Sequence, residues 1–391
     1  MAQPDVTVIV GVYNGLPYFR QCLTSLEEQS LAAGRLEVVV VDDGSTDGSG
    51  AYAERFARRS RLTVRVVHQA NSGGPSGPRN VGLGMAGGRY VFFLDADDHL
   101  GPEALERMVA AADANGTDVV LGRITGINRK APRSMFTENV GRTDPYRSNA
   151  LQTMSAEKLF RRELVERHGM RFKEGVLHGE DTCFTLEAYI RADGISVVAD
   201  YPCLYIVRRT DGGNLTSASS ITEGILAAQV QLELIADLLP PGDDRDLLSV
   251  RPLRLKVLRT FGPRMRKQSQ ETWRACFALA APLVADYATE GVRRRLKPHE
   301  RLLLHGIHQQ RADLVSDTLA LLAARGAEPG GTPEPAPAAG RPAVAEPARS
   351  RPSRLGTRLH ARRRKADRSR RTAGGPGRVA EEPPQKTGGS V

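Results

Sequence analysis

Short, almost purely apolar runs alternate with amphipathic stretches along residues 6–98. Runs of β-branched residues that stop abruptly at polar ones are typical of buried strands, whereas leucines on one face, as at Leu23 and Leu26, are typical of a helix. Strands are therefore predicted at residues 6–12, 38–41, 62–68 and 90–98, and helices at about 16–29, 48–58 and directly after residues 71–80. Apolar strands that alternate with helices predict a parallel sheet covered on both faces.

Polar residues follow each of the four apolar runs. They are Gly11 and Tyr13, then Asp42 and Asp43, then Asn71, and finally the acids Asp95, Asp97 and Asp98. Ligands of open parallel sheets bind outside the carboxyl ends of the strands. We therefore expect these four groups to meet along one edge of the sheet.

The pattern changes beyond this sheet. Residues 118–207 look mixed, with strands predicted at 118–122 and 195–199 and a helix at 156–167. Leu-rich amphipathic segments then predict helices up to about Arg325, with breaks at the prolines of positions 240–241, 263 and 298. The predicted organisation is an α/β domain over residues 1–218, a helical subdomain over 219–327 and a tail over 328–391.

The tail is rich in Pro, Ala, Gly and Arg and cannot bury enough apolar surface to offset its chain entropy, so we expect disorder. It also carries most of the net charge of +10, because 14 Lys and Arg face six Asp and Glu from Glu328 onward. It is either a solvated low-complexity segment or a basic arm for a polyanion, such as an anionic membrane or a teichoic-type phosphate polymer. Specific nucleic-acid binding is not favoured, since no aromatic residues for base stacking are interleaved.

Cysteine usage and the N-terminus favour a cytoplasmic location. The four cysteines are scattered and form no CxxC pair, which argues against a disulfide framework or a structural zinc. No apolar run approaches the roughly 18–20 residues of a transmembrane helix. An acid, rather than a basic stretch, precedes the first apolar run, unlike a signal peptide. The basic tail leaves contact with the inner face of a membrane open.

The sequence Asp-Ala-Asp-Asp at 95–98 is the clearest candidate metal site. Carboxylates at i and i+2 on a fraying strand end can turn toward one point and suit a hard divalent ion that also holds a diphosphate. The alternative is a capped turn before the helix that Pro102 introduces. The other acids nearby in the pattern favour the metal site.

Two further acidic pairs have both a chemical and a structural interpretation. Asp42 and Asp43 could accept hydrogen bonds from a ribose or a uracil ring, or could form an Asx-turn. Glu180 and Asp181 precede a predicted helix. A carboxylate there could be a general base or a helix N-cap.

The loop NSGGPSGPRN at 71–80 raises the question of phosphate binding. It lacks the Lys-Ser/Thr that closes a P-loop, and it is not GxGxxG. Pro78 fits the first turn of a helix, which leaves Arg79 near the positive end of that helix. Arg79 could bind a phosphate, or could form a structural bridge to an acid such as Asp95.

Taken in order, VTVIVGVYNG, VVVVDDGSTD, NSGGPSGPRNVGL, FFLDADD and GEDTCF resemble the signature of inverting family 2 glycosyltransferases with the GT-A fold. The resemblance covers roughly residues 5–215. The segments 71–80, 134–136 (SMF) and 155–165 (SAEKLFRRELV) look closer still to the wall teichoic acid β-N-acetylglucosaminyltransferases, which modify poly(ribitol phosphate). The resemblance implies a GT-A domain with a mostly parallel central sheet, followed by the helical subdomain and the disordered basic tail.

The resemblance also implies a role for each motif residue. The nucleotide-sugar site would comprise Gly11, Tyr13, Asp43, Asn71, Arg79, Asp95 and an arginine at 208 or 209, with Arg209 preferred. Asp97 would bind Mn²⁺ or Mg²⁺. Asp181 would deprotonate the acceptor hydroxyl, with Glu180 beside it. Two departures stand out: Gly11 replaces a common proline, and helices replace the β-rich modules of the close relatives, so trimerisation does not transfer.

These implications add up to a metal-dependent inverting transferase. It would move a sugar, GlcNAc by resemblance, from a UDP-sugar to a hydroxyl of a polyanionic or polysaccharide acceptor such as a teichoic-acid-type polymer. The alternatives are a glycosyltransferase for another polysaccharide or a glycolipid, and a nucleotide-sugar-binding protein without catalysis. Binding alone would not need Asp181, which favours the enzyme.

Overall fold

The computed structural model describes residues 3–175, 179–210 and 221–324 of the chain. The predicted tail at 328–391, and the predicted domain boundary between residues 218 and 219, lie outside these ranges. Both remain predictions.

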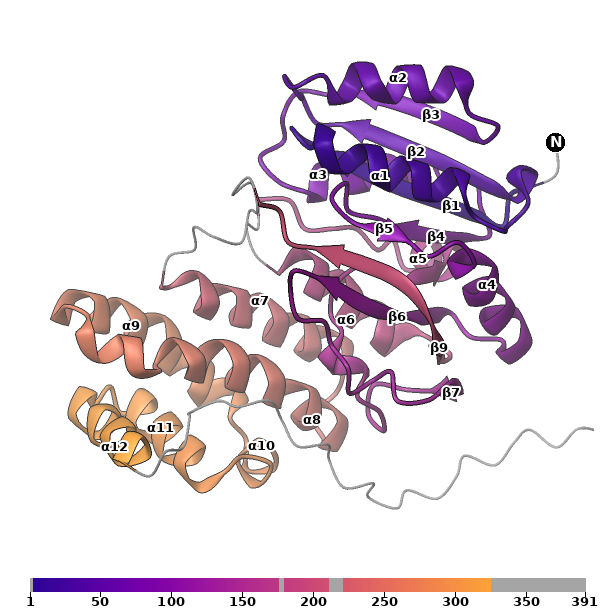
Figure 1. Ribbon diagram of the computed structural model, residues 1–391. Coiled ribbons are helices and arrows are strands. Elements are labelled where there is room, and N and C mark those ends of the chain that lie inside the picture. The colour runs from indigo at the N-terminus through magenta and orange to yellow at the C-terminus, as the bar shows by residue number, and fades with distance from the viewer. Residues whose placement is uncertain (1–2, 176–178, 211–220, 325–391) are drawn as a thin grey trace, which may run out of the picture. The chain divides into compact units, whose positions relative to one another are not determined.

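Residues 6–93 form the parallel sheet that the apolar pattern predicts (Figure 1). Its strands are β1 (Val6–Val12), β2 (Leu36–Asp42), β3 (Thr63–His68) and β4 (Tyr90–Phe93), in the spatial order β3-β2-β1-β4. The connecting helices are α1 (Leu16–Glu27), α2 (Ser49–Arg59) and α3 (Ser76–Met85). A 3₁₀ turn, Ala33–Arg35, precedes β2.

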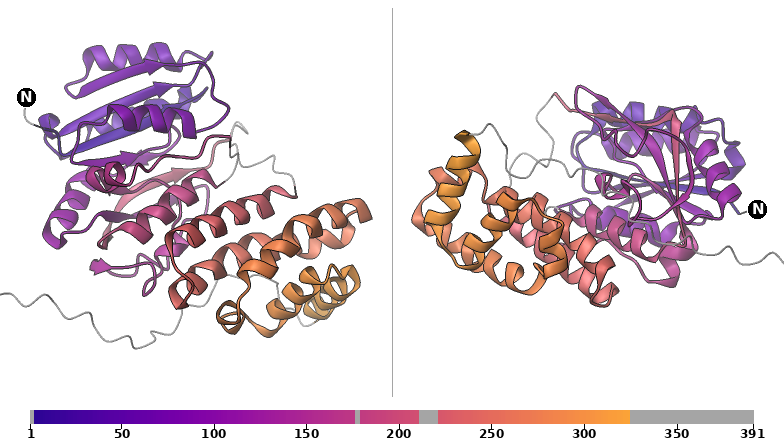
Figure 2. Two further views of the ribbon diagram at one scale, coloured as in Figure 1. Left: turned by 180° about the vertical axis from the view of Figure 1, so that it is seen from behind. Right: turned by 90° about the horizontal axis from the view of Figure 1, so that it is seen from below.

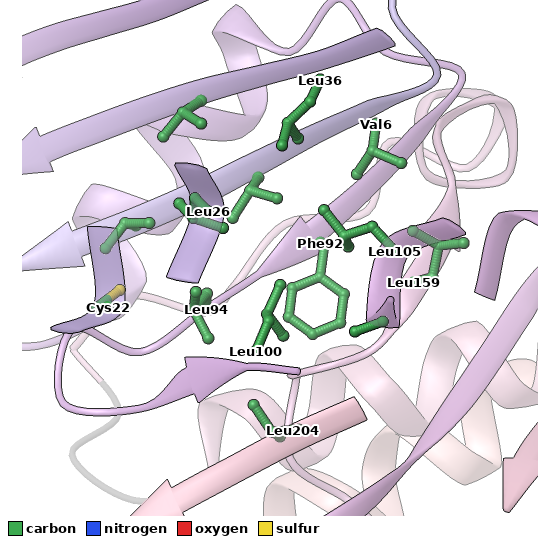
Figure 3. Packing of buried hydrophobic residues seen from close by; sticks show 14 of the residues in the cluster. Val6, Cys22, Leu26, Leu36, Phe92, Leu94, Leu100, Leu105, Leu159 and Leu204 are labelled. Atoms are coloured by element: carbon green, nitrogen blue, oxygen red, sulfur yellow. The ribbon is translucent and has the colours of Figure 1, made fainter. Parts of the chain in front are cut away.

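Helices cover both faces of the sheet, and the alternation along the strands decides which residue faces which layer (Figures 1 and 2). Tyr90 and Phe92 of β4 pack with α1, α2 and α4 (Ala104–Asn115). Val91 and Phe93 pack with α3 and with α5 (Arg162–Arg167) and α6 (Glu180–Arg191) on the other face. Figure 3 shows the first layer, where Phe92 converges with residues of α1, α4 and the neighbouring strands.

The second half of the sheet is mixed. It adds β5 (His99–Leu100), β6 (Val119–Ile127), β7 (Val140–Thr143), β8 (Leu159–Arg161) and β9 (Ile195–Val207), and a 3₁₀ turn at Ala150–Gln152. β8 runs antiparallel between β4 and β6, and β5 and β7 run antiparallel to β9, whereas β6 and β9 are parallel. The parallel character is therefore confined to β3-β2-β1-β4 and to the β6–β9 pair.

Two predicted boundaries are wrong in this region. The predicted strand at 90–98 leaves the sheet after Phe93, and the following acids form a turn in which Asp98 N donates to Asp95 O at 3.0 Å. The predicted helix at 156–167 begins only at Arg162. Leu159 and Phe160 instead pair with both β4 and β6, because a strand there fills the gap in the sheet.

The predicted helical region is confirmed over the described residues 221–324. Its elements are α7 (Glu223–Leu238), α8 (Asp243–Pro252), a π-helical segment (Leu253–Leu258), a 3₁₀ segment (Pro263–Lys267), α9 (Gln270–Tyr287), α10 (Glu290–Arg294), α11 (Pro298–His308) and α12 (Ala312–Ala324). The breaks at prolines 240–241, 263 and 298 are present. Pro252 and Pro282, by contrast, lie within helices. The π-helix starts directly after Pro252, whose missing N–H removes one helical hydrogen bond.

Within the ranges that the structure describes, none of the helices combines the length and the apolar character needed to cross a membrane.

Candidate active site

The carboxyl ends of the four parallel strands lie at one edge, as predicted. Val12 is in register with Asp42, and Asp42 with His68, so the loops after β1, β2 and β3 start side by side. Asn14 N donates to Ser45 Oγ at 3.1 Å, which ties the first loop to the second. The polar residues after the strands are therefore neighbours, and we refer to this place as the acidic edge.

Asp43 organises two of these loops. Its side chain is buried and accepts from Gln69 Nε2 at 2.6 Å and from the backbone and hydroxyl of Ser72 at 3.0 Å. Asn71 Nδ2 donates to Asp43 O at 3.1 Å, and Asn71 Oδ1 accepts from Gly73 N. Both predicted nucleotide-pocket residues thus lie together, with Asp43 inside the loop framework and Asn71 exposed.

Gly11 is closely packed, whereas the side chain of Tyr13 is exposed. A Cβ added at Gly11 would stand 3.1 Å from Cβ of Pro78, so glycine lets the first turn of α3 pack closely against β1. Tyr13 is 52% exposed, which is unusual for a large side chain and leaves its ring free to stack on a planar group.

Arg79 links the predicted metal turn to Glu180, the neighbour of the predicted base Asp181. The guanidinium is 7% exposed, donates to Asp95 Oδ1 at 2.7 Å and reaches Glu180 Oε1 at 3.4 Å. It also lies 5.2 Å from the ring centre of Phe172. Burial opposes the charge, but Asp95, Asp181 and Glu180 outweigh it and raise the pKa of Arg79 above its ordinary value. The structural bridge to Asp95 that the sequence left open is therefore present.

Asp95, Asp97 and Asp98 form the acidic turn. Each offers a carboxylate oxygen, and these atoms lie within 4.8 Å of one another. Burial, and next the charge of Asp95, raise the pKa of Asp97 to about 6. An all-oxygen set of three closely spaced carboxylates that repel one another fits a hard cation such as Mn²⁺ or Mg²⁺.

Glu157 lies behind this turn and was not among the predicted site residues. It is buried against Asp98, and the two carboxyl groups share a hydrogen bond, which requires a proton on one of them. Burial, with the charge of Asp98, raises the pKa of Glu157 well above its ordinary value. Asp98 also accepts from Val207 N at 2.7 Å. The sequence signal was weak, because Glu157 stands in a mixed segment, SAEKLFRR, in which charged residues flank Leu159 and Phe160.

Glu180 and Asp181 occupy the first turn of α6, whose N-cap is Gly179 with φ 101°. Neither acid is therefore the N-cap, and that alternative is wrong. Burial and Asp181 raise the pKa of Glu180, although Arg79 opposes the shift. Asp181 is partly exposed and accepts from Thr182 N at 2.6 Å. It is the more accessible carboxylate of the pair.

Of the two candidate arginines, Arg209 faces the acidic edge. It donates to Asn14 O at 3.1 Å, lies 5.3 Å from the ring centre of Tyr18, and its charge opposes the raised pKa of Asp97. Arg208 is exposed, and its backbone N donates to Ile127 O.

Three further cations interact with Asp181, and none was predicted. Burial lowers the pKa of Lys158 to about 8, and it lowers the pKa of Arg251 and of Lys256. In each case the charge of Asp181 opposes the shift. Arg251 and Lys256 belong to α8 and the π-helical segment, so the helical region contributes positive charge to the side of the site that carries Asp181.

A central sheet of this topology, with an acidic turn after its fourth strand, defines a GT-A nucleotide-sugar domain. Residues 7–179 match the family model of glycosyl transferase family 2, and residues 228–318 match that of the glycosyl transferase TarS linker domain. Residues 7–179 therefore form a glycosyl transferase family 2 domain, as the motifs indicated.

Its relatives include enzymes of teichoic acid glycosylation. The chain is 36% identical over 214 residues to poly(ribitol-phosphate) beta-glucosyltransferase of Bacillus spizizenii. The aligned segment covers 54% of this chain and 34% of that protein. The chain is 33% identical over 273 residues to poly(ribitol-phosphate) beta-N-acetylglucosaminyltransferase TarS of Staphylococcus aureus, covering 68% and 47%. The match thus spans about a third to a half of these relatives.

The solved structures agree with the sequence relatives. A crystal structure of S. aureus TarS residues 1–349 with UDP-GlcNAc superimposes with a TM-score of 0.74 at 29% identity, over 83% of this chain and 92% of that chain. The same fragment with UDP gives a TM-score of 0.72 at 28% identity.

Proposed function

We propose that the chain is an inverting glycosyltransferase that moves a sugar from a UDP-sugar to a hydroxyl of a teichoic-acid-type poly(polyol phosphate). The observation that carries this proposal is the position of Arg79, which holds Asp95 of the acidic turn and Glu180 beside Asp181 in one cluster. The carboxylates that would act on the leaving diphosphate and the carboxylate that would deprotonate the acceptor therefore lie next to each other, as a single displacement requires.

The nucleotide would occupy the loops after β1, β2 and β3. The exposed ring of Tyr13 is available to stack on uracil, and Asn71 borders the same loop. Asp43 would position the loop that contacts the uracil base. Alternatively, it would bind the base directly if the ligand replaced one of the hydrogen bonds that its carboxylate accepts. Arg209 would approach the diphosphate from the opposite side of the acidic turn.

Asp97, with Asp95, would hold Mn²⁺ or Mg²⁺. Such an ion supplies positive charge against the diphosphate as UDP leaves. The three carboxylates of the turn repel one another, and a bound cation would relieve this repulsion. Arg79 is bound to Asp95 and keeps one of these carboxylates in place.

Asp181 would act as the general base. It takes the proton of the acceptor hydroxyl while that oxygen forms a bond to the anomeric carbon and the bond to UDP breaks, which inverts the configuration. Glu180 is buried and bound to Arg79, whereas Asp181 is partly exposed, so Asp181 is the carboxylate that an acceptor hydroxyl can reach. General-base assistance of this kind is typically worth about 10²–10⁴-fold.

The acceptor side carries positive charge. Lys256 and Arg251 are half-buried, and burial lowers the pKa of both side chains, whereas the charge of Asp181 opposes this shift. A phosphate of the acceptor would compensate these charges, which favours a polyanionic polymer over a neutral polysaccharide. The relatives named for poly(ribitol phosphate) support the same choice.

We propose UDP-GlcNAc as the donor, because the TarS fragment that superimposes on this chain was solved with that nucleotide sugar. UDP-glucose is the second candidate, since one of the relatives is named as a glucosyltransferase.

The test is UDP release with each donor, Mn²⁺ and poly(ribitol phosphate). We expect release that depends on the acceptor. A chain that binds UDP-GlcNAc but releases no UDP with any donor or acceptor would be a binding protein, and release only with a neutral glycan or glycolipid would refute the polyanionic acceptor.

A further inference from the structure

We infer a second ligand site in the helical region, for an anionic polyol such as a segment of a polyol phosphate chain. A cavity of about 400 Å³ lies between the start of α9 and the connection from α11 to α12. This volume is within the range of about 300–1,000 Å³ that is usual for ligand pockets. None of its lining residues belongs to the acidic edge.

The floor of the cavity is aromatic. Trp273 and Phe277 are one helical turn apart on α9 and are 8% and 4% exposed. Both pack against Phe261, with ring centres 6.0 and 5.2 Å away. The indole N–H of Trp273 makes no hydrogen bond to any residue that the structure describes. It is not among the buried polar atoms that lack a partner, so it is open to solvent and available as a donor.

The cation that lines the cavity is Arg274, which is exposed and makes no ion pair with any described residue. The preceding 3₁₀ segment carries Arg264, Arg266 and Lys267, which are exposed but do not line the cavity. The one lining carboxylate, Asp313, is bound by Arg311, whose hydrogen bond lowers the pKa of Asp313 to about 2.

These groups define what the cavity can bind. Arg274 and the indole N–H are hydrogen-bond donors that can bind an oxyanion. The amides of Gln270 and Gln310 can exchange hydrogen bonds with hydroxyl groups. The rings of Trp273 and Phe277 suit C–H surface. A polyol phosphate offers all three along one chain. Its identification with the acceptor polymer rests on the proposed function, whereas the site rests on the cavity alone.

The sequence provides a direct probe, because Trp273 is the only tryptophan. We would follow its emission while titrating the full chain with ribitol 5-phosphate and with a short ribitol phosphate oligomer. A saturable change is expected with both. Arg274→Gln keeps the fluorophore and should weaken binding about tenfold or more, as loss of a charged hydrogen bond does. Arg301→Gln is the matched control, because Arg301 is exposed on α11 and does not line the cavity; its affinity should equal that of the wild type.

Four results would overturn the inference. They are an emission that stays constant up to millimolar oligomer, an equal response to neutral ribitol, an equal loss of affinity in Arg301→Gln, and displacement of the oligomer by UDP with Mn²⁺. The last would put the oligomer at the acidic edge. A chain without transferase activity that still gives the saturable, Arg274-dependent change would refute the proposed function and leave this site standing.

Discussion

Two buried arginines of this protein, each 7% exposed, do opposite things. Arg254, in the helical region, binds both oxygens of the buried Glu300 at 2.8 and 3.0 Å and also Arg295 O. Glu300 in turn accepts from Lys297 N at 2.8 Å. The charged groups of this pair find their hydrogen-bond partners within the protein, and we call such a pair closed.

Arg79 is part of an open cluster. It holds Asp95, whose side chain is 43% exposed, and reaches Glu180 at the longer distance of 3.4 Å. Asp97 and Asp181 stand near it with further negative charge. The difference teaches how to separate structure from chemistry: a closed buried pair contributes to the fold, whereas an open cluster with surplus carboxylates is ready for a ligand.

The largest expected effect is on the open side. Asp181→Asn should lower transfer by about 10²–10⁴-fold, because the amide cannot accept the proton of the acceptor hydroxyl. Binding of UDP-sugar and Tm should change little. Glu187→Gln on the same helix is the control and should keep its activity, since Glu187 forms an ion pair with Arg191 and contacts none of the described residues of the proposed site. Wild-type turnover in Asp181→Asn would assign the base elsewhere.

The closed pair should respond in stability rather than in activity. Arg254→Met leaves Glu300 buried without its partner, which we expect to cost about 3–5 kcal/mol in urea unfolding. The double variant Arg254→Met/Glu300→Leu should recover much of this loss. Arg311→Gln removes an exposed pair and should leave stability almost unchanged, because water screens the interaction of such charges. Loss of activity in Arg254→Met without loss of stability would break the distinction between the two arginines.

Replacement of Asp97 should change both the stability of the protein and its binding of UDP. Its folded pKa, about 6, lies above the ordinary value of 3.8, so the folded state binds more protons and loses stability as pH rises from about 4 to 6. Asp97→Asn should flatten that part of the Tm-against-pH curve and raise Tm at pH 7. It should also abolish the Mn²⁺-dependent part of UDP binding by calorimetry. Unchanged UDP affinity would exclude Asp97 from the metal site.

The smallest expected effect concerns the second loop of the edge. His68 Nδ1 lies 2.9 Å from Asp42 and Nε2 lies 3.2 Å from Glu54, and the hydrogen bond to Asp42, opposed by burial, raises the pKa of His68. Its stabilising charge is fully present below the unfolded pKa of about 6.5 and is lost as pH rises through the higher folded value. The Tm difference between wild type and His68→Gln should therefore be larger at pH 6 than at pH 9. An equal difference at both values would contradict this assignment.

Much of the acidic edge follows from the sequence. The first four strands are rich in β-branched and aromatic residues, so their parallel packing between helices was predictable, and with it the meeting of Tyr13, Asp43, Asn71 and Asp95. Residues 156–167 were misjudged because Leu159, Phe160, Leu164 and Val165 satisfy a helical spacing as well as a strand followed by a helix. Pairing with β4 and β6 decides between the two, and that pairing is not local.

The sequence by itself therefore determined the elements with a strong local period and the chemistry at their ends. The tertiary structure decided which charges lose water and which charges meet. Glu157 is one of several charged residues at 157–162, and only the fold sets it against Asp98. Arg251 and Lys256 look like ordinary basic residues of a helix, yet in the fold their charges interact with that of Asp181. Electrostatic energies depend on distance and burial in space, and neither quantity is written in the order of residues along the chain.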